Sequence, residues 1–452
     1  MQIENTPSRS FLTSLKKLTN SFFTTKQTLL RGEAAGRINI LLLGRAGTSY
    51  PGKNLTDTVM VMSIDTTTKQ VALLSLPRDL YVPIGDTDLY GKLNGVYQYG
   101  LAQDEGVEPL KKTIATITGL PIHYFVTIDF DGFEKIVDTL GGISLNVVRD
   151  FYDPRYPGKN YSYETFKIKK GWQTLDGATA LKYVRERHND PEGDFGRSKR
   201  QQQLIQAIKS KAFSLGTFFN VVTVNNLLDT LGDSVRTDMS LEDMGRFLDL
   251  AHNIDTTNVT TVVIDAWKKE SLLRVSHIQV GDIAAFILVP RVGNFSELVD
   301  TSHTIFHRDE QKKRKRTITK EASTVTLFAQ RTDSDAASEI ANLLTEEMGF
   351  AEVTLVWLPA MDKRQEKSII VERMSLTKPF SLDELLKKFS LTQMATLPFS
   401  TPHQTDSDFN IVLGSDLVET FSLKEATPEE LAATNDPASP ESFPPQPLKK
   451  LR

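Results

Sequence analysis

The sequence predicts an α/β protein built from two units, the first larger than the second. Three continuous apolar runs in the first half have the pattern of buried central strands: Ile38–Leu43, Val59–Ile64 and Val71–Leu76. Between residues 324 and 413, apolar strand runs alternate with helical patterns, which is typical of a small α/β unit. The chain has 452 residues, 39% of them hydrophobic, which is enough for two domains that each bury a core.

The first apolar run, Ile38–Leu43, is followed by Gly44, Gly47 and Gly52. These glycines predict a flexible turn at the carboxyl end of a strand. Ligands in open α/β sheets usually bind at that end of the strands. The sequence therefore predicts a site at this edge of the sheet.

The second and third runs carry carboxylates at their ends, because Asp57 precedes one and Asp79 follows the other. The short segment Asp65–Gln70 allows the two strands to pair antiparallel, which would bring both aspartates to one edge. Two such carboxylates suit a hard divalent cation, which takes oxygen ligands and keeps waters and substrate phosphates in its shell. Either aspartate alone is more often a turn or capping residue. Arg78, beside Asp79, favours a functional site.

Arginine is concentrated in residues 183–201, just before a predicted apolar-periodic helix. Guanidinium groups are planar, always charged and able to engage phosphate oxygens in pairs, so this composition is typical of a phosphate site. A solvated charged loop is the competing interpretation. The spacing favours the site, because the groups share faces: Arg185 with Arg187 if residues 182–188 are extended, and Arg197 with Arg200 and Gln201 on the first turn of the helix.

The same helix continues into an apolar stripe of Leu204, Ile205 and Ile208. Its first turn also offers unpaired backbone N–H groups to an anion. A polar head group and an apolar tail could therefore be held together there. The alternative is that the stripe packs in the core.

Composition excludes some classes of function. The net charge of −4 gives no support to general nucleic-acid binding, and there is no helix-turn-helix pattern with basic recognition positions. Cysteine is absent, so the chain has no disulfides and no thiolate metal sites.

Taken in order, these motifs resemble the LytR-CpsA-Psr family of cell-envelope glycopolymer transferases over roughly residues 37–300. The family pattern appears here as Gly44, Asp57-Thr58, Ser75-Leu-Pro-Arg78-Asp79, Lys92-Leu-Asn94, Leu140-Gly141-Gly142, Arg185-Glu-Arg187 and Asp194-Phe-Gly-Arg197-Ser-Lys-Arg200-Gln201. Two positions depart from it. Ala46 stands where many members have Asp, and Leu55 stands where many have Arg.

The resemblance implies a central mixed sheet flanked by helices, an apolar lipid pocket, and a phosphotransferase reaction. Such an enzyme moves a glycosyl phosphate from a polyprenyl-pyrophosphate carrier to a sugar hydroxyl of peptidoglycan or another wall acceptor. It does so with Mg²⁺, at the extracytoplasmic face of the membrane. The helices near residues 110–117 and 204–208 are the candidate walls of the lipid pocket.

The resemblance also implies a role for each matching residue. Asp57 would bind Mg²⁺, and Asp79 would be a second metal ligand or a base for the attacking hydroxyl. Arg78, Arg185 and Arg187 would hold the pyrophosphate at the catalytic centre, and the remaining substrate contacts would come from Arg197, Arg200 and Gln201. Two alternatives remain open at this point: a polyprenyl-pyrophosphate hydrolase, and a non-catalytic protein that binds polyprenyl phosphate or glycopolymer.

The chain divides into five predicted segments. Residues 1–36 are a leader without a clear transmembrane span, in which Phe11, Leu15, Leu18 and Phe22 have helical spacing that suits an interfacial helix, a helix packed on the domain or a disordered leader. Residues 37–305 are the catalytic domain, and 306–322 a charged linker. Residues 323–420 resemble the LytR carboxy-terminal domain, and 421–452 form a disordered tail rich in Pro, Glu, Ala and Ser.

Overall fold

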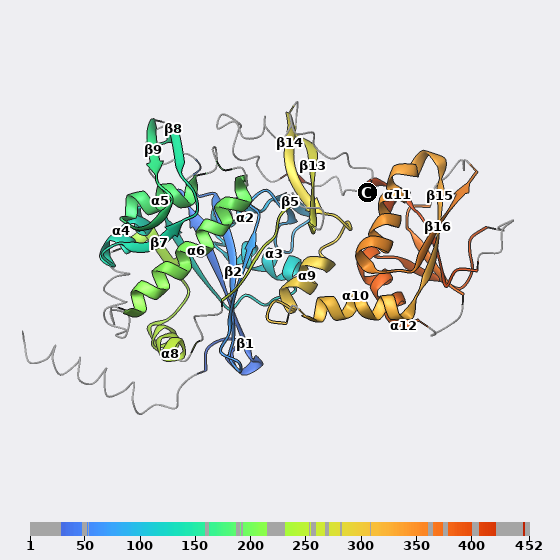
Figure 1. Ribbon diagram of the computed structural model, residues 1–452, viewed down its shortest axis with the longest axis horizontal. Helices are drawn as coiled ribbons and strands as arrows, with labels where there is room; N and C mark the ends of the chain where they lie inside the picture. Colours follow the sequence, from blue (N-terminus) through green and yellow to red (C-terminus); the bar gives the residue numbers. More distant parts are fainter. Residues whose placement is uncertain are drawn as a thin grey trace, which may run out of the picture.

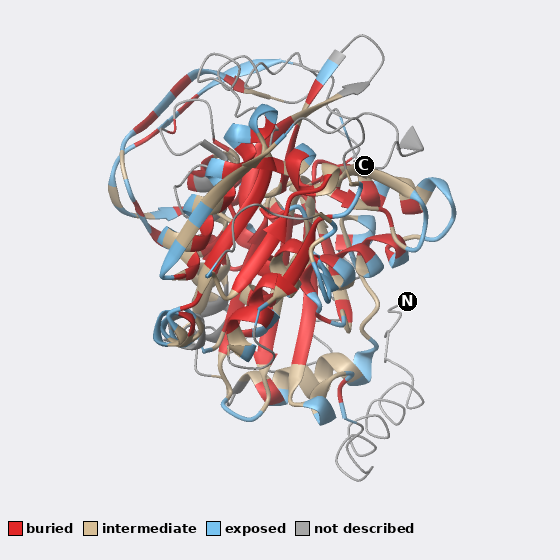
Figure 2. Cartoon of the chain, turned by 90° about the vertical axis from the view of Figure 1, so that its right-hand side faces the viewer, coloured by how far each residue is buried: buried red, intermediate tan, exposed pale blue. Residues whose placement is uncertain are grey.

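Two α/β units lie side by side in the computed structural model (Figure 1). It describes residues 29–47, 52, 54–158, 162–186, 190, 193–214, 231–252, 254, 259–266, 271–280, 283–307, 309–359, 365–373, 378–399, 406–421 and 446–447. Buried residues concentrate along the central strands and the helix surfaces that face them (Figure 2). The predicted α/β class and its two units are confirmed.

Sheet A, the central sheet of the first unit, has six strands in the order β11-β6-β1-β2-β3-β12. Their bounds are, in that order, Val235–Thr237, Tyr124–Asp129, Arg37–Arg45, Thr56–Asp65, Val71–Leu76 and Thr260–Val263. β1 is parallel to β6 and antiparallel to β2, so the sheet is mixed. The three apolar runs form β1, β2 and β3. The backbone N–H of Asp65 donates to the carbonyl of Gln70 at 3.0 Å, which closes the predicted turn between β2 and β3.

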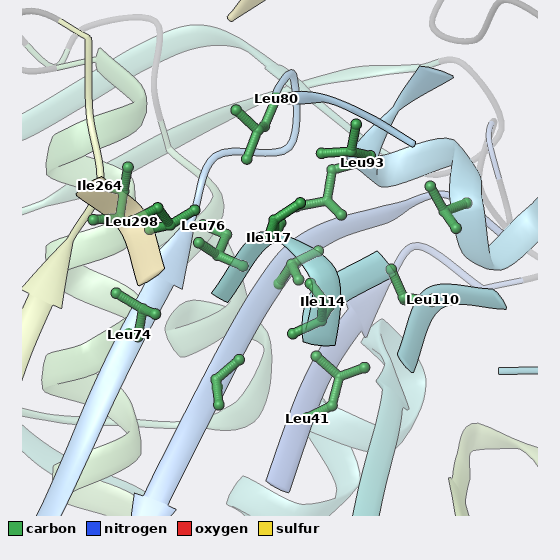
Figure 3. Packing of buried hydrophobic residues seen from close by; sticks show 14 of the residues in the cluster. Leu41, Leu74, Leu76, Leu80, Leu93, Leu110, Ile114, Ile117, Ile264 and Leu298 are labelled. Carbon is green, nitrogen blue, oxygen red and sulfur yellow. The ribbon is translucent and has the colours of Figure 1, made fainter. Parts of the chain in front are cut away.

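The helices of the first unit cover both faces of sheet A. They are α2 (Leu93–Ala102), α3 (Glu108–Thr118), α4 (Phe130–Thr139), α5 (Gly177–Arg185), α6 (Gly193–Ser214), α8 (Leu241–His252) and α9 (Ser296–His303), with short turns η1 (Glu33–Ala35) and η3 (Gly232–Ser234). Alternation along the strands divides the core between the faces. Leu41, Leu74 and Leu76 pack with α3 (Figure 3), whereas the hydroxyl of Ser75 points the other way and accepts a hydrogen bond from Gln202 of α6 at 2.8 Å.

The two helices predicted to line a lipid pocket therefore lie on opposite faces of sheet A. Leu110, Ile114 and Ile117 of α3 are each 0% exposed within the cluster of Figure 3. Leu204 of α6 belongs to a separate cluster. Because the sheet separates the two helices, they do not line one common pocket, and a pocket bounded by either helix alone stays a prediction.

A long antiparallel ribbon, described over residues 143–158 and 162–175, packs against α4, α5 and α6. Its strands are β7 (Ile143–Val147), β8 (Phe151–Pro157), β9 (Tyr163–Ile168) and β10 (Gly171–Leu175). β7 pairs with β10, and β8 pairs with β9. The inner face of the ribbon is apolar, and the ring of Phe151 meets Tyr183 of α5 edge to face at a centroid distance of 5.7 Å.

Two hairpins lie beside the ligand-binding edge predicted for sheet A. One joins β4 (Tyr81–Pro83) to β5 (Leu89–Lys92), and the other joins β13 (Leu273–Val280) to β14 (Ile283–Pro290). In the predicted tail, β20 (Gln446–Pro447) pairs with β5, so these two residues depart from the expected disorder. The rest of the tail beyond Phe421 lies outside the described residues.

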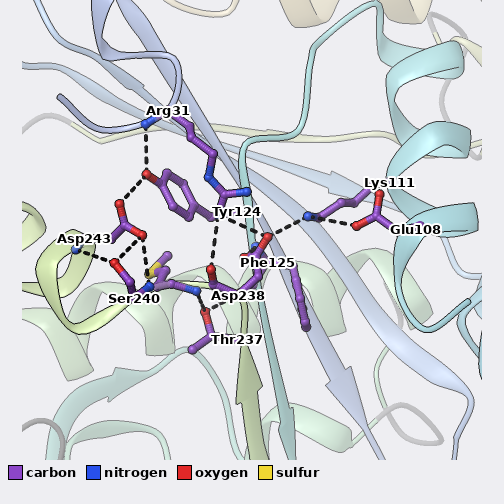
Figure 4. Close-up of polar contacts among 10 residues, drawn as sticks. Arg31, Glu108, Lys111, Tyr124, Phe125, Thr237, Asp238, Ser240 and Asp243 are labelled. Atoms are coloured by element: carbon purple, nitrogen blue, oxygen red, sulfur yellow. Dashed lines mark hydrogen bonds and ion pairs between the residues drawn. The ribbon is translucent and has the colours of Figure 1, made fainter. Parts of the chain in front are cut away.

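Residues 29–36 pack on the first unit, although the prediction placed them in the leader. Leu30 is buried beside Tyr124, and the guanidinium carbon of Arg31 lies 3.9 Å from the centroid of that tyrosine ring. The phenol of Tyr124 donates to Asp243 of α8 at 2.9 Å, and Arg31 also pairs with Asp238 (Figure 4). The predicted helix that includes Phe11 lies outside the described residues. Within the described part of the chain, no helix is long and apolar enough to cross a bilayer.

The second unit contains a five-stranded sheet in the order β16-β15-β19-β17-β18. Its elements are β15 (Thr324–Gln330), η4 (Arg331–Asp333), α11 (Ser334–Asn342), η5 (Leu343–Met348), β16 (Glu352–Leu358), β17 (Ile369–Glu372), α12 (Pro379–Phe389), β18 (Thr392–Met394), β19 (Phe409–Val412) and α13 (Ser415–Phe421). The helix predicted over residues 336–348 exists, and its last six residues have π-helical geometry. The alternation of strands and helices read from the sequence is confirmed.

The segment predicted as a charged linker is a helix, α10 (Asp309–Glu321). Ile318 is 2% exposed in the core of the second unit, and Arg314 pairs with Asp300 of α9 at 2.8 Å. The prediction of a linker without regular structure is wrong, because buried Ile318 and the ion pairs of Arg314 with Asp300 and Glu384 fix a helix between the units, although the sequence has no apolar stripe there.

Candidate functional site

The candidate site lies at one edge of sheet A, where β1, β3 and β6 end and β2 begins. Gly44 of β1 pairs with Thr58, and Val59 of β2 pairs with Leu76 of β3. This register places Asp57 just before the pairing and Arg78 just after it. The sequence prediction that the β2–β3 hairpin brings these groups to one edge is therefore confirmed.

Arg78 links the two aspartates. Its Nη1 lies 2.8 Å from Oδ1 of Asp57, and its Nε lies 3.4 Å from Oδ2 of Asp79. The Asp57 side chain is 36% exposed and the Asp79 side chain 19% exposed. The edge thus presents two partly open carboxylates with one guanidinium between them.

Lys92, at the end of β5, is the second cation of this group. Its Nζ donates to Oδ1 of Asp79 at 2.8 Å. Burial alone would raise the pKa of Asp79, but the charges of Arg78 and Lys92, the hydrogen bond from Lys92 and the charge of Arg197 lower the pKa below its ordinary value. Asp79 is therefore a carboxylate at neutral pH. Lys92 was not among the predicted site residues, although the Lys92-Leu-Asn94 motif contained the signal.

Backbone hydrogen bonds fix the turn that carries Arg78. The N–H of Asn94 donates to the carbonyl of Arg78 at 3.0 Å, and the N–H of Leu93 donates to that of Leu80 at 2.8 Å. On the other side, the N–H of Leu288 in β14 donates to the carbonyl of Asp79 at 2.9 Å. Three hydrogen bonds from two separate segments hold this turn, which reduces the freedom of its charged side chains.

Arg197 reaches the same edge from α6. Its Nη2 donates to the carbonyl of Asp57 at 3.3 Å, and the residue is 6% exposed. The helix begins at Gly193, so Arg197 lies in its second turn rather than in the predicted first turn. The predicted helical spacing is confirmed. Arg197 faces the edge because of the helix face on which it lies, and the N-terminus of α6 is not needed to bring it there.

Arg185 is the last residue of α5, so residues 182–185 are helical, and the extended conformation under which Arg185 and Arg187 would share a face does not hold for them. The helix forms because Asp176 caps it, accepting a hydrogen bond from the N–H of Thr179 at 2.8 Å. The guanidinium carbon of Arg185 lies 4.1 Å from the ring centroid of Phe130, which directly follows β6. Arg185 is thus at the same edge as Arg78, on the β6 side. Arg187 lies outside the described residues.

Arg200 has a different set of partners from those expected of a substrate ligand. It is 2% exposed, its Nε donates to the carbonyl of Tyr183 at 2.9 Å, and it also contacts the carbonyl of Glu186 and the carboxylate of Asp190. Arg149 of the ribbon binds the other oxygen of Asp190 at 2.7 Å. These contacts favour a structural role for Arg200. We call Arg149, Asp190 and Arg200 the clasp.

Two glutamines of α6 bind different neighbours of the helix. Gln202 is 4% exposed and bonds Ser75, and Gln203 donates to the carbonyl of Asn146 in the ribbon at 2.8 Å. Gln201, the predicted substrate contact, precedes them on the helix and is half-buried. Its role toward the substrate stays a prediction.

The two departures from the family pattern are buried. Ala46 is 7% exposed and Leu55 is 3% exposed. Arg45 has its Nη2 at 3.4 Å from Oδ2 of Asp129, which also caps α4 by accepting a hydrogen bond from Gly132. Gly47 has a φ of +87° and lies where a Cβ atom would come 3.1 Å from Asp129. The guanidinium of Arg45 is therefore paired with the Asp129 carboxylate, next to the edge.

The donor set at the edge suits a cation that arrives with a phosphate ligand. Among the described residues there is no group of three or more His, Cys, Asp or Glu side chains that could hold a metal by themselves. Asp57 and Asp79 are hard oxygen donors and partly open. Mg²⁺ is commonly held by one or two carboxylates plus substrate phosphates, so these residues fit it only with substrate oxygens completing the shell.

Sequence comparisons concern the part of the chain that carries this edge. The model of the LytR_cpsA_psr family matches residues 8–282. The polyisoprenyl-teichoic acid–peptidoglycan teichoic acid transferase TagU of Oceanobacillus iheyensis is 33% identical over 234 residues, 50% of this chain and 67% of that protein. The regulatory protein MsrR of Staphylococcus aureus strain COL is 37% identical over 197 residues, 43% of this chain and 54% of MsrR.

One solved structure that the chain matches is that of Bacillus subtilis TagV. It has a TM-score of 0.46 and 25% identity, covering 60% of this chain and 96% of TagV. The matched region of this chain spans 54% of the length of MsrR and 67% of TagU. The second unit, from β15 onward, lies beyond the residues that the family model matches.

Proposed function

This chain belongs to the LytR_cpsA_psr family, and from that premise we propose that it transfers a glycopolymer, as glycosyl phosphate, from a polyprenyl-pyrophosphate carrier to a hydroxyl of a cell-wall glycan. The place of action is the cell envelope, at the extracytoplasmic face of the membrane. The observation that carries the proposal is the cluster of Arg78, Lys92 and Arg197 around Asp57 and Asp79, with Arg185 at the same edge.

The chemistry is a displacement at phosphorus. The acceptor hydroxyl oxygen forms a bond to the phosphorus that carries the sugar, the bond from that phosphorus to the bridging oxygen breaks, and polyprenyl phosphate leaves. The hydroxyl proton passes to solvent or to a nearby base. Such reactions depend mainly on positioning and on neutralising the charge of the phosphate oxygens. Fixed guanidinium groups at one edge of a rigid sheet supply both.

The cations have separate positions in this scheme. Arg78 and Arg197 approach from β3 and α6, and Arg185 approaches from α5, so a pyrophosphate at the edge meets positive charge from three elements. Arg187 is the expected fourth contact. Arg200 supports this set through the clasp, because it binds the carbonyls of Tyr183 and Glu186 on either side of Arg185.

Asp79 acts as an anchor for the cations or as a metal ligand in this proposal. A general base is most effective when its pKa lies near the working pH. The lowered pKa of Asp79 moves it away from that range. Its contacts with Arg78 and Lys92 instead hold both cations at the edge.

Mg²⁺ is the proposed cofactor, held by Asp57, with Asp79 as the second candidate ligand and pyrophosphate oxygens completing its shell. When bound, it would neutralise phosphate charge. The apolar chain of the carrier needs a pocket beside the edge, and the cluster under α3 is the candidate because it reaches Leu80 and Leu93 in the segments that hold Arg78. The second unit is proposed to be a LytR carboxy-terminal-like domain with a binding or scaffolding role.

The test uses the full chain with a synthetic polyprenyl-pyrophosphate-linked saccharide and uncrosslinked peptidoglycan strands. We expect glycosyl phosphate on the acceptor and free polyprenyl phosphate. Asp57→Asn should raise the Mg²⁺ concentration needed for half-maximal rate, and Arg185→Ala should lower turnover by about 10-fold or more. The control is Arg373→Ala, which removes an exposed arginine paired with Asp406 in the second unit, away from the edge.

Three results would contradict the proposal. Sugar phosphate released free in solution would identify a hydrolase. Lipid binding without turnover would identify a binding protein. Turnover that does not respond to Mg²⁺ would remove the metal from the scheme while leaving the arginines in place.

A further inference from the structure

The outer face of the ribbon exposes large aromatic side chains that its fold does not require. Trp172 is 77% exposed, Tyr163 is 62% exposed and Tyr152 is 58% exposed, and Val148 beside them is 52% exposed. Tyr and Trp combine an apolar ring with a polar group and are enriched at interfaces, so three of them on one ribbon indicate a binding face. The inner face is already filled by Val147, Phe151, Phe166 and their neighbours, so the outer aromatics add nothing to the core.

Within each of the two strand pairs of the ribbon, the register places these side chains on one face. Tyr152 pairs with Lys167, and Tyr163 pairs with Pro157, while Asp153, Tyr156 and Phe166 of the opposite face are buried. Farther along the ribbon, Trp172 pairs with Asn146, and Thr174 pairs with Ser144. Because side chains alternate along a strand, each of these pairs projects from the side opposite the helices.

The remaining side chains of this face are polar and short. Ser144, Asn146, Thr165 and Thr174 are exposed, and the hydroxyls of Ser144 and Thr174 lie 2.8 Å apart. Lys167 adds a cation beside Tyr152. Flat rings stack on the C–H faces of pyranose sugars, while neighbouring amides and hydroxyls bond their hydroxyl groups, and a lysine complements a carboxylate.

We propose that this outer face is the docking platform for the acceptor, an extended glycan strand that bears carboxylate groups. This inference rests on the proposed function, to which it adds the place where the acceptor binds. A membrane surface fits less well, because the aromatic rings are interspersed with hydroxyl and amide groups rather than joined into one apolar patch.

The ribbon also connects this platform to the arginines. Tyr156, on the inner face of β8, lies 5.7 Å from the guanidinium carbon of Arg185, measured to the ring centroid. Arg149, between β7 and β8, binds Asp190, which also holds Arg200. A glycan on the outer face is therefore one strand layer from the residues proposed to hold the pyrophosphate.

The first experiment measures binding without catalysis. Full chains are sedimented with purified peptidoglycan sacculi from which attached polymers have been removed. We expect Trp172→Ala with Tyr152→Ala to weaken binding at least about 10-fold, as for aromatic anchors of other interfaces. Trp172→Phe should recover part of the binding, since it keeps a ring. Leu241→Ala, at an exposed apolar residue at the start of α8 in the first unit, is the matched control and should bind normally.

The second experiment measures transfer. The double variant should raise the KM for soluble glycan strands at least about 10-fold and leave kcat and the binding of the lipid-linked substrate unchanged. Sacculus binding is measured independently of turnover, so an inactive wild-type chain would count against the proposed function alone. Normal sacculus binding by the double variant would overturn the platform. The same variant is also tested for binding to vesicles of phosphatidylglycerol and phosphatidylethanolamine, and a loss of vesicle binding alone would assign the face to the membrane instead.

Discussion

Arg78 stands between two carboxylates, and its shape matters as much as its charge. Nη1 and Nε of one planar group face Asp57 and Asp79 at the same time. A lysine carries a single point charge on a flexible stem and cannot face both carboxylates with two atoms of one planar group. We therefore expect activity to fall even when Arg78 is replaced by lysine, which keeps the charge.

We expect Arg78→Ala to reduce kcat/KM for the lipid-linked substrate by about 10- to 150-fold, since a charge-assisted contact contributes about 1.5–3 kcal/mol. Without the guanidinium, two carboxylates would also repel the incoming phosphates. Arg78→Lys should recover only part of the loss. Steady-state kinetics of the two variants check this, and full recovery by lysine would show that a charge alone is sufficient.

At the scale of elements, the clasp holds the end of α5 against α6 and the ribbon. The Asp190 side chain is 0% exposed and receives Arg149 from the ribbon and Arg200 from α6. Gly196 packs against that carboxylate so closely that a Cβ atom would collide with it. Only glycine at position 196 therefore leaves room for the Asp190 carboxylate to lie against α6.

Asp190→Asn should lower the free energy of unfolding by about 3–5 kcal/mol, because it leaves two guanidinium groups with no carboxylate between them. Gly196→Ala should destabilise through the same contact, although alanine is ordinarily better than glycine in a helix by about 1 kcal/mol. The control is Gly95→Ala in α2, where a Cβ atom meets nothing within 4 Å and which should stabilise the protein. Urea unfolding measures all three, and a stabilised Gly196→Ala variant would contradict the clasp.

At the scale of the whole molecule, charged groups join the two units. Arg291 binds both oxygens of Glu297 at 2.7 and 2.8 Å and also contacts Glu347 of the second unit. Lys388 of α12 reaches Glu297 at 3.2 Å. Burial alone would raise the pKa of Glu297, but the hydrogen bond from Arg291 and the charges of Lys388 and Arg291 lower the pKa below its ordinary value of 4.5.

The lowered pKa fixes the sign of a pH dependence. A carboxylate with a lowered folded-state pKa contributes stability above its unfolded value, and this stability is lost as the pH falls through the folded value. Glu297→Gln should therefore lower the Tm at pH 7, and the difference from the native chain should shrink below pH 4.5. Glu108→Gln, in an ion pair whose carboxylate is 60% exposed, is the matched control. Equal effects of both variants at pH 7 would contradict a special role for the junction.

The sequence by itself determined the parts of this protein that depend on local pattern. Apolar runs of strand length gave β1, β2 and β3, and the short turn between β2 and β3 was sufficient to bring Asp57 to Arg78. The alternation in the second unit and the helix around Arg197 followed from periodicity in the same way. These features depend on residues a few positions apart in the chain, so a single sequence is sufficient to predict them.

Only the tertiary structure decided which partners the charged groups take. Arg200 belongs to a buried pair with Asp190, Arg185 ends a helix rather than sharing a strand face with Arg187, and α10 replaces a linker. Arg197 meets a carbonyl 140 residues away along the chain. Spacing gives the face of an element but not what packs against that face, because packing is settled by burial and by ion pairs between distant segments.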